Sequence, residues 1–199
     1  MLALIVASNA FQAPYIVSKN GLPGDVGFDP LKLSTYDLNI MSATKKKRTS
    51  EEILNDYREA ELKHGRLAML ASLAYPLQEK LNPIVSSTLN LPNLLEKTGG
   101  LSPSLLNGGL DQGRIPTFLF GVAVAIAMLE VRGMELTSNN PARLPGDYEL
   151  RLTSTKPGDD EFTKLQAGEI WNSRIAMIAM LGYVVQEALT KVPVANTLF

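Results

Sequence analysis

Residues 61–79 read ELKHGRLAMLASLAYPLQE, and residues 169–187 read EIWNSRIAMIAMLGYVVQE. Nine of the 19 aligned positions are identical, and the second stretch begins 108 residues after the first. This spacing is far too long for a solenoid, whose repeat units follow one another directly. The two stretches therefore indicate two copies of one helix in a single chain.

The most apolar part of the chain lies between the two copies. Residues 115–129 read IPTFLFGVAVAIAML without a charge, and the pattern continues to Leu136. A helix that crosses a bilayer needs about 20 mostly apolar residues. Two copies that flank such a helix predict an all-α membrane protein with parallel repeats and three transmembrane helices. We expect these helices near residues 52–80, 114–136 and 162–190, in a membrane domain formed by residues 52–199.

Composition excludes several classes of function. Lys and Arg (19) nearly balance Asp and Glu (20), so no basic excess favours nucleic acid as a partner. The chain has no cysteine and one histidine, which excludes thiolate sites and the usual His-cluster metal sites. An enzyme with a Ser-His-Asp triad would have to use His64. We expect no enzyme and no catalytic residues.

The basic residues of the connections predict the orientation in the membrane. Residues 45–48 read KKKR, and residues 132–164 add five Lys or Arg, whereas residues 80–113 contain only two. The N-terminus and the second connection are thus expected on the same, non-translocated side. An odd number of spans then places the C-terminus on the opposite side.

Each copy begins with a Glu that is followed five residues later by an Arg. Five residues correspond to about 140° of rotation, so Glu61 and Arg66 cannot easily neutralise each other. If the first and third helices cross as a pseudo-twofold pair, Glu61 meets Arg174 and Glu169 meets Arg66. Reciprocal pairing makes such charges tolerable in a bilayer, whereas lone charges would merely anchor helix ends at the interface.

His64 and Asn172 occupy the same position of the two copies, three residues after the Glu. Each offers a single neutral donor, and a carboxylate that is neutralised by Arg can still give one oxygen to Mg²⁺. Separated single donors suit a metal that brings its own equatorial ligands, as in chlorophyll. They do not suit a metal cage built by the protein.

The motifs ELKHGRLAM and EIWNSRIAM resemble the paired signatures of the light-harvesting chlorophyll-binding superfamily. PGDVGFDPLKLS at residues 23–34 resembles the segment before the first membrane helix of that family. The resemblance implies chlorophyll a, possible chlorophyll c and xanthophyll carotenoids, with Mg²⁺ only as the chlorophyll centre. It also implies axial ligands at Glu61, His64, Glu169, Asn172, Gln186 and Glu130, and a carotenoid motif that contains Asp29.

The repeat suggests one further ligand. Gln78 lies 14 residues after His64, as Gln186 lies 14 residues after Asn172. Duplication preserves geometry, so Gln78 is expected to bind magnesium directly or through a water. The alternative is a solvated glutamine at the end of a helix that Pro76 kinks.

The first 51 residues are expected to form a targeting remnant and a stromal segment. SNAFQAP at residues 8–14 resembles the cleavage junction of precursors imported into red-lineage plastids. The long first connection resembles the red-lineage chlorophyll a/b-binding-like branch, which is associated with photosystem I. The resemblance therefore implies a multi-pass thylakoid protein of the chloroplast, with a stromal N-terminus and a lumenal C-terminus, beside a photosystem core, other antenna proteins and thylakoid lipids.

The resemblance implies an antenna that absorbs light and passes the excitation energy to a photosystem core, and two other functions remain open from the sequence. A photoprotective relative would dissipate excitation energy through the same ligands. An ion-coupled transporter would use Glu61, Glu130 and Glu169 as a proton path, which predicts unpaired carboxylates along a cavity. The Arg at the matching position of each copy argues against the transporter.

Overall fold

The computed structural model describes residues 22–26, 28–37, 48–90, 92–140, 143–150 and 159–198. Within these residues the regular structure is helical, and the isolated bridge between Ser104 and Gly108 is the only β-type pairing. The predicted all-helical fold is confirmed for this part of the chain. Its long helices are α3 (Ser50–Leu89), α5 (Ile115–Asn139) and α6 (Asp160–Thr190), and its short ones are η1 (Leu33–Thr35), α4 (Leu94–Lys97) and α7 (Ala195–Leu198).

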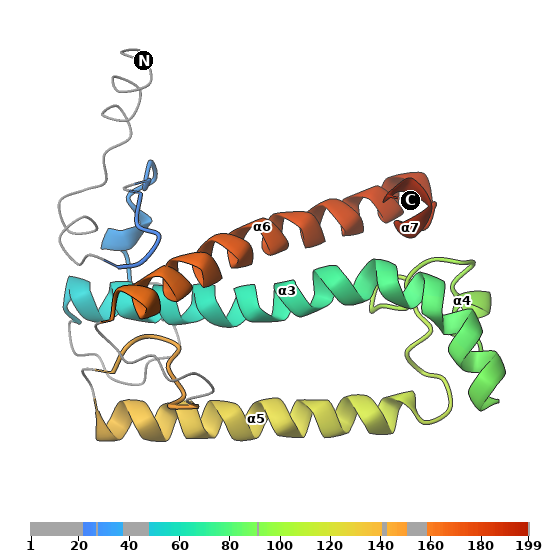
Figure 1. The fold of residues 1–199 in the computed structure, drawn as a ribbon, viewed down its shortest axis with the longest axis horizontal. Helices are drawn as coiled ribbons and strands as arrows, with labels where there is room; N and C mark the ends of the chain where they lie inside the picture. Colours follow the sequence, from blue (N-terminus) through green and yellow to red (C-terminus); the bar gives the residue numbers. More distant parts are fainter. Residues whose placement is uncertain are drawn as a thin grey trace, which may run out of the picture.

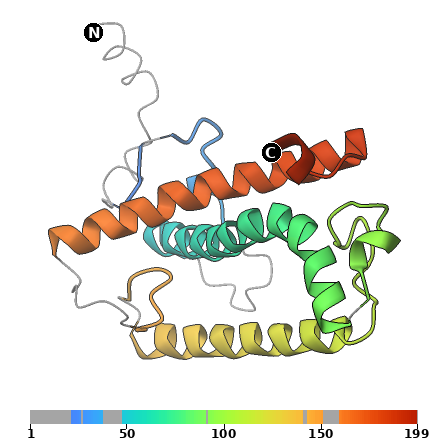
Figure 2. The ribbon, with the colours of Figure 1, turned by 45° about the vertical axis from the view of Figure 1, so that its right-hand side comes forward.

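Helices α3 and α6 run in the same direction and pack against each other, whereas α5 runs in the opposite direction (Figures 1 and 2). Their buried residues follow a three-residue spacing on each helix, which places one stripe of each helix against the other. Each member of one stripe lies 108 residues from its counterpart in the other, so equivalent residues of the two copies form the contact between the helices. The stripes are Leu62, Gly65 and Ala68 on α3 and Ile170, Ser173 and Ala176 on α6.

Helix α3 is longer than the sequence predicted. A capping box between Thr49 and Glu52 starts it at Ser50, and it continues through Pro76 and Pro83 to Leu89. Figure 1 shows its last turns bending toward the start of α5. The predicted end near residue 80 is wrong, because two prolines bend this helix without ending it. Helices α5 and α6 differ from the predicted bounds by three residues or fewer.

Helix α5 is exposed along almost its whole length. Gly133 and Leu136 are its only buried residues. It is also the one helix in the described part of the chain that is long and apolar enough to cross a membrane. Helices α3 and α6 are less apolar than α5, because charged residues are spread along both of them, among them Glu79 and Lys80 on α3 and Arg174 and Glu187 on α6. The arrangement with three spans therefore remains a prediction.

Several predictions lie outside the described residues. They concern the targeting junction at residues 8–14, the lysines at 45–47 and Gly27, which begins the sequence GFDP within residues 23–34. The second connection is described from residue 143 to 150 and again from residue 159. The roles expected of these undescribed positions therefore stay predictions.

Candidate functional site

Two ion pairs join α3 and α6 where the helices converge. Arg66 Nε lies 2.7 Å from Glu169 Oε1, and Arg174 Nε lies 2.7 Å from Glu61 Oε1. Arg66 and Arg174 occupy the same position of the two copies, as do Glu61 and Glu169, so one pair is the counterpart of the other. The pseudo-twofold crossing predicts this arrangement. Each helix thus supplies one anion and one cation to these two pairs, whose charges cancel.

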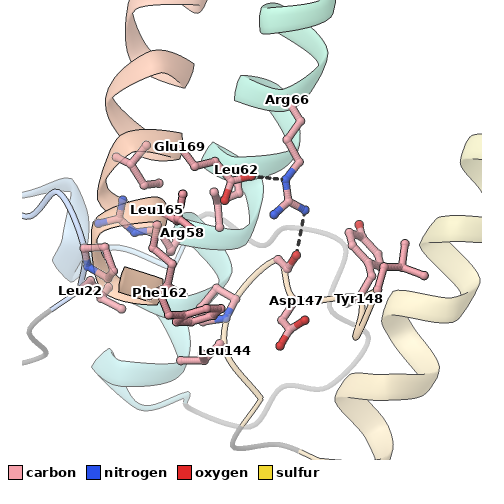
Figure 3. A pocket seen from close by; sticks show the side chains of 16 residues that line it. Leu22, Arg58, Leu62, Arg66, Leu144, Asp147, Tyr148, Phe162, Leu165 and Glu169 are labelled. Atoms are coloured by element: carbon pink, nitrogen blue, oxygen red, sulfur yellow. Dashed lines mark hydrogen bonds and ion pairs between the residues drawn. The ribbon is translucent and has the colours of Figure 1, made fainter. Parts of the chain in front are cut away.

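The second nitrogen of each arginine reaches a connecting segment. Arg66 Nη1 donates to the carbonyl oxygen of Gly146, and Arg174 Nη1 donates to that of Gly24, both at 2.8 Å. Figure 3 shows the former contact, with the Tyr148 ring next to the guanidinium group. Each arginine therefore ties its own helix to the segment that precedes the other helix.

The sequence LPGD occurs at residues 22–25 and again at 144–147, and these are the two segments that the arginines hold. Gly24 and Gly146 both have φ of 72°, which is the left-handed region that favours glycine. A Cβ at either position would also lie 2.7–2.8 Å from Ile170 or Leu62. Sequence reasoning missed this second repeat, although comparing the two connections would have found it.

The closest approach of the two helices is between Gly65 and Ser173. A Cβ on Gly65 would lie 2.3 Å from the Cβ of Ser173, and Ser173 is fully buried. Glycine at one of the two equivalent positions is therefore required by the packing. The short distance between the helices brings each arginine within reach of the opposite glutamate.

His64 and Asn172 lie on exposed positions and use one polar atom in the same way. His64 Nδ1 lies 2.8 Å from the carbonyl oxygen of Ala60, and Asn172 Nδ2 donates to that of Gly168 at 2.9 Å. A carbonyl oxygen only accepts, so His64 Nδ1 is the donor in this contact, and in the neutral ring Nε2 is then the nitrogen with the lone pair. Both side chains thus present one further donor atom, His64 Nε2 and Asn172 Oδ1, which fits axial ligation of a chlorophyll magnesium.

The two glutamates at the crossing differ in their second oxygen. Glu61 Oε2 lies 2.8 Å from Arg58 Nη1, so both of its oxygens contact arginine. Glu169 is paired with Arg66 alone among the described residues, because Gln166 occupies the position that corresponds to Arg58. Glu169 therefore has the freer oxygen for a magnesium ion.

Glu130 connects α5 to α3. Its Oε2 lies 2.7 Å from Lys63 Nζ, which is also 3.1 Å from Glu59 Oε1. A cavity of about 710 Å³ lies here between α3 and α5, and His64 is among its lining residues. The carboxylates at 61, 130 and 169 are all paired with cations, so the structure does not supply the unpaired carboxylates that the transporter hypothesis requires.

Gln78 and Gln186 are both half-buried. The side chain of Gln78 makes no hydrogen bond within the described part of the chain, and the residue lies well inside α3, which continues to Leu89. The alternative of a glutamine at the end of a helix is therefore wrong. Near these glutamines, the rings of Tyr75 and Tyr183 are stacked with centroids 6.0 Å apart.

Asp29 organises the turn that follows it. Its carboxylate accepts hydrogen bonds from Leu33 N at 2.8 Å, from Ser34 N at 3.0 Å and from Ser34 Oγ at 2.6 Å. Burial works to raise the pKa of Asp29, but these hydrogen bonds lower it below its ordinary value. The structure thus gives Asp29 a role in a turn, and its role toward a carotenoid stays a prediction.

At the far end of the helix pair, Glu79 and Glu187 are buried without a cation in the described part of the chain. Glu187 accepts from the Tyr75 hydroxyl, from Ser102 N at 3.0 Å and from Asn107 Nδ2 at 2.7 Å. Glu187 thus binds the segment that follows α3. Glu79 accepts from Val194 N and Ala195 N in the segment that follows α6, and also from Ser102 Oγ. Their identity in the repeat was the available sequence signal.

A cavity of about 510 Å³ lies beside the second LPGD segment (Figure 3). Arg66 and Glu169 form one of its walls, and Leu62, Leu144 and Phe162 provide apolar surface. Its lining combines these apolar side chains with charged groups, among them Arg58, Arg66 and Glu169. This is the character of a site for a largely apolar ligand with a polar end group.

Comparisons with known proteins agree with this geometry. The family described as "Chlorophyll A-B binding protein" matches residues 17–188. A fucoxanthin-chlorophyll a-c binding protein of Isochrysis galbana is 36% identical over 67% of this chain and 64% of its own length. Chlorophyll a-b binding protein 6A of Solanum lycopersicum is 30% identical over 83% of this chain and 60% of its own length.

A light-harvesting complex stress-related protein of Chlamydomonas reinhardtii is 31% identical over 66% of this chain and 53% of its own length. The matched region thus spans less than two thirds of each of these three relatives. The resemblance to the light-harvesting superfamily is confirmed, and the fucoxanthin-chlorophyll a-c relatives support a red-lineage type of antenna. The paired signatures and the match over residues 17–188 show that the chain belongs to the chlorophyll A-B binding protein family.

Proposed function

We propose that this protein is a light-harvesting antenna that binds chlorophylls and carotenoids and passes excitation energy to a photosystem core. The observation that carries the proposal is that His64 and Asn172 make the same kind of hydrogen bond and leave the same kind of donor atom available. Each has one polar atom bound to the carbonyl oxygen four residues earlier, and each keeps a second donor atom available on an exposed face. Two equivalent exposed donors on crossing helices suit two chlorophylls related by the same pseudo-twofold axis.

The other ligands follow from charge balance. Glu61, Glu169 and Glu130 each contact a cation, so their carboxylates can bind magnesium without leaving a net charge in the membrane. Glu169 and Glu130 have an oxygen that contacts no cation among the described residues, whereas Glu61 would use a lone pair that its two arginine contacts leave. Gln78 and Gln186 offer neutral amide oxygens, directly or through a water. The magnesium enters only as the centre of chlorophyll a or c, and chlorophyll when bound supplies the absorption and transfer of light energy.

The chain itself fixes the positions of the pigments. The Gly65–Ser173 contact and the two ion pairs fix how α3 and α6 cross. The ion pair between Lys63 and Glu130 connects α5 to α3. The cavities beside His64 and beside the second LPGD segment provide room for a chlorophyll ring and a xanthophyll end group. Asp29 is proposed to position a carotenoid through the turn that it organises.

The exposed apolar face of α5 supports a place in the thylakoid membrane of the chloroplast, with α3, α5 and α6 as three spans. The basic flank of α3 favours a stromal N-terminus and a lumenal C-terminus. We place the protein in the red-lineage chlorophyll a/b-binding-like branch, beside photosystem I, neighbouring antenna proteins and thylakoid lipids. It is proposed to act without catalysing a reaction.

The test is the pigment content of single-donor variants. His64→Leu and Asn172→Leu are each expected to lose one chlorophyll per protein after refolding with pigments, while both ion pairs and the helix content remain. Asn55→Leu, on the first turns of α3, is the matched control and should keep every pigment. Pigment extraction with protein quantification measures the count, and an unchanged count in both donor variants would refute the assignment.

A second candidate function rests on the similarity to the stress-related protein of Chlamydomonas reinhardtii. A dissipating protein would use the same ligands but convert the excitation energy to heat. The fluorescence lifetime of the purified complex separates the two functions. A lifetime close to that of an antenna in detergent supports harvesting, and a strongly shortened lifetime supports dissipation.

A further inference from the structure

The part of α3 that the sequence did not predict encloses a cavity with the start of α5. The cavity has a volume of about 270 Å³ and lies between Asn82 and Val85 on α3 and Ile115 and Phe118 on α5, with Leu94 of α4 at its side. This volume is smaller than the pockets of about 300–1,000 Å³ that hold drug-sized ligands. It is therefore too small for a tetrapyrrole ring, and it differs from the two cavities assigned above.

Two polar groups of this cavity lack a partner within the described part of the chain. Asn82 Nδ2 is buried there without a hydrogen bond. The side chain of Arg114, which precedes α5, forms no hydrogen bond or ion pair with the described residues. The other polar side chains are occupied, because Ser86 Oγ donates to Pro83 O and Gln112 Nε2 donates to Asp111 Oδ1. The two groups are donors and one is a cation, so the matching ligand is an anionic acceptor.

The remaining walls of the cavity are apolar and open onto the membrane-facing surface. Phe118 is 69% exposed and Val85 is 42% exposed. The exposed apolar surface continues along α5 through Leu119 and Val122. A ligand whose head lies at Asn82 and Arg114 can therefore lay an apolar tail along α5.

We propose that this cavity binds the anionic headgroup of a membrane lipid, with its phosphate or sulfonate oxygens at Arg114 and Asn82 and its acyl chains on α5. A bound anion satisfies the buried amide and neutralises the arginine, neither of which has a partner among the described residues. The inference rests on the membrane placement of α5 in the proposed function. It does not depend on the chlorophyll ligands.

The test uses the full chain refolded with its pigments in a neutral detergent. The complex is incubated with phosphatidylglycerol or with zwitterionic phosphatidylcholine, washed, and assayed for retained lipid by native mass spectrometry. The wild type should retain phosphatidylglycerol in preference to phosphatidylcholine. Arg114→Gln should reduce the retention about tenfold, which is the loss expected for one charge-assisted hydrogen bond.

Two further variants make the test specific. Asn82→Asp keeps the size of the side chain but adds a negative charge, so it should also lose phosphatidylglycerol. Arg132→Gln is the matched control, because Arg132 lies near the other end of α5 and pairs with Glu135, and it should retain the lipid. Chlorophyll per protein is measured in the same samples, so a failure of the proposed pigment function is seen separately.

Equal retention of the two lipids by the wild type would overturn the proposal, as would full retention of phosphatidylglycerol by Arg114→Gln. A xanthophyll lost from Arg114→Gln without any change in lipid would also overturn it. That result would assign the cavity to an oxygenated carotenoid end group instead.

Discussion

Each end of the α3–α6 pair contains two glutamates that occupy the same position of the two copies, and the two ends stabilise these carboxylates differently. Where the helices cross, Glu61 and Glu169 each contact an arginine of the other helix. At the far end, Glu79 and Glu187 contact no cation in the described residues and accept hydrogen bonds from connecting segments. The first end is balanced in charge, whereas the second satisfies its carboxylates with neutral donors.

The difference shows how one duplication supports two kinds of attachment. Ion pairs between α3 and α6 determine whether the helices stay together. Hydrogen bonds from Glu79 and Glu187 determine whether the segments after each helix stay in place. Disruption of the first end should therefore affect the whole domain, and disruption of the second should affect one segment at a time.

The largest effect is expected for Arg66→Leu. It leaves Glu169 without its cation, while Arg174→Leu leaves Glu61 still in contact with Arg58. We expect a loss of about 3 kcal/mol for Arg66→Leu, the lower end for a broken buried pair, because both side chains are about one third exposed in the bare chain. Thermal and denaturant unfolding of the refolded complex measure it.

The double variant Arg66→Leu with Glu169→Gln should recover part of that loss, as should Glu61→Gln with Arg174→Leu. Arg132→Leu removes an exposed intrahelical pair and serves as the control with little effect. Equal losses for Arg66→Leu and Arg174→Leu would contradict the asymmetry that Arg58 creates. Strictly additive damage would show that the paired residues are not partners.

A smaller effect is expected at the helix contact. Gly65→Ser places a side chain where even a Cβ would lie 2.3 Å from Ser173, so the helices must move apart at a cost of about 1–3 kcal/mol. Ser173→Gly in the same chain exchanges the two residues and should restore most of the stability. The melting temperature of the complex is the measure, and the exchange failing to restore it would exclude a simple steric contact.

At the far end, Glu187→Gln should release the segment that contains Ser102 and Asn107. The amide presents a donor to groups that are donors themselves, at a cost of about 1–3 kcal/mol. Hydrogen exchange with mass spectrometry should show faster exchange around Ser102, with little change at Ala195. Glu79→Gln is the matched variant, and its largest change should appear at Ala195. The same global change in both variants would contradict the local attachment.

The smallest effect concerns pH at the turn after Asp29. Its pKa is lowered in the folded chain, so the carboxylate contributes stability that is fully present above the ordinary Asp pKa of about 3.9. This contribution is lost as the pH falls through the lowered pKa. Hydrogen exchange at Leu33 and Ser34 should accelerate there, and Asp29→Asn should remove the pH dependence. A pH-dependent change that persists in Asp29→Asn would assign it to another group.

Much of this architecture is present in the sequence. The repeat at residues 61–79 and 169–187 predicts two equivalent helices, and the offset between Glu and Arg predicts their reciprocal pairing. Side-chain identity carries this information, because an unpaired charge in a membrane requires an opposite charge at a defined position. The axial-ligand roles of His64 and Asn172 likewise begin as predictions from the repeat.

Only the tertiary structure showed how the rest of the molecule is attached to these helices. The carbonyl oxygens of Gly24 and Gly146 and the N–H groups that bind Glu79 are backbone atoms, which are not specific to any residue type. The continuation of α3 to Leu89 was likewise visible only in the structure, since Pro76 and Pro83 predict an earlier end. The sequence by itself determined which charges must meet. The folded chain decided which backbone groups lie beside them, because almost every residue offers a carbonyl oxygen and an N–H group, and residue type does not say which of them a distant side chain meets.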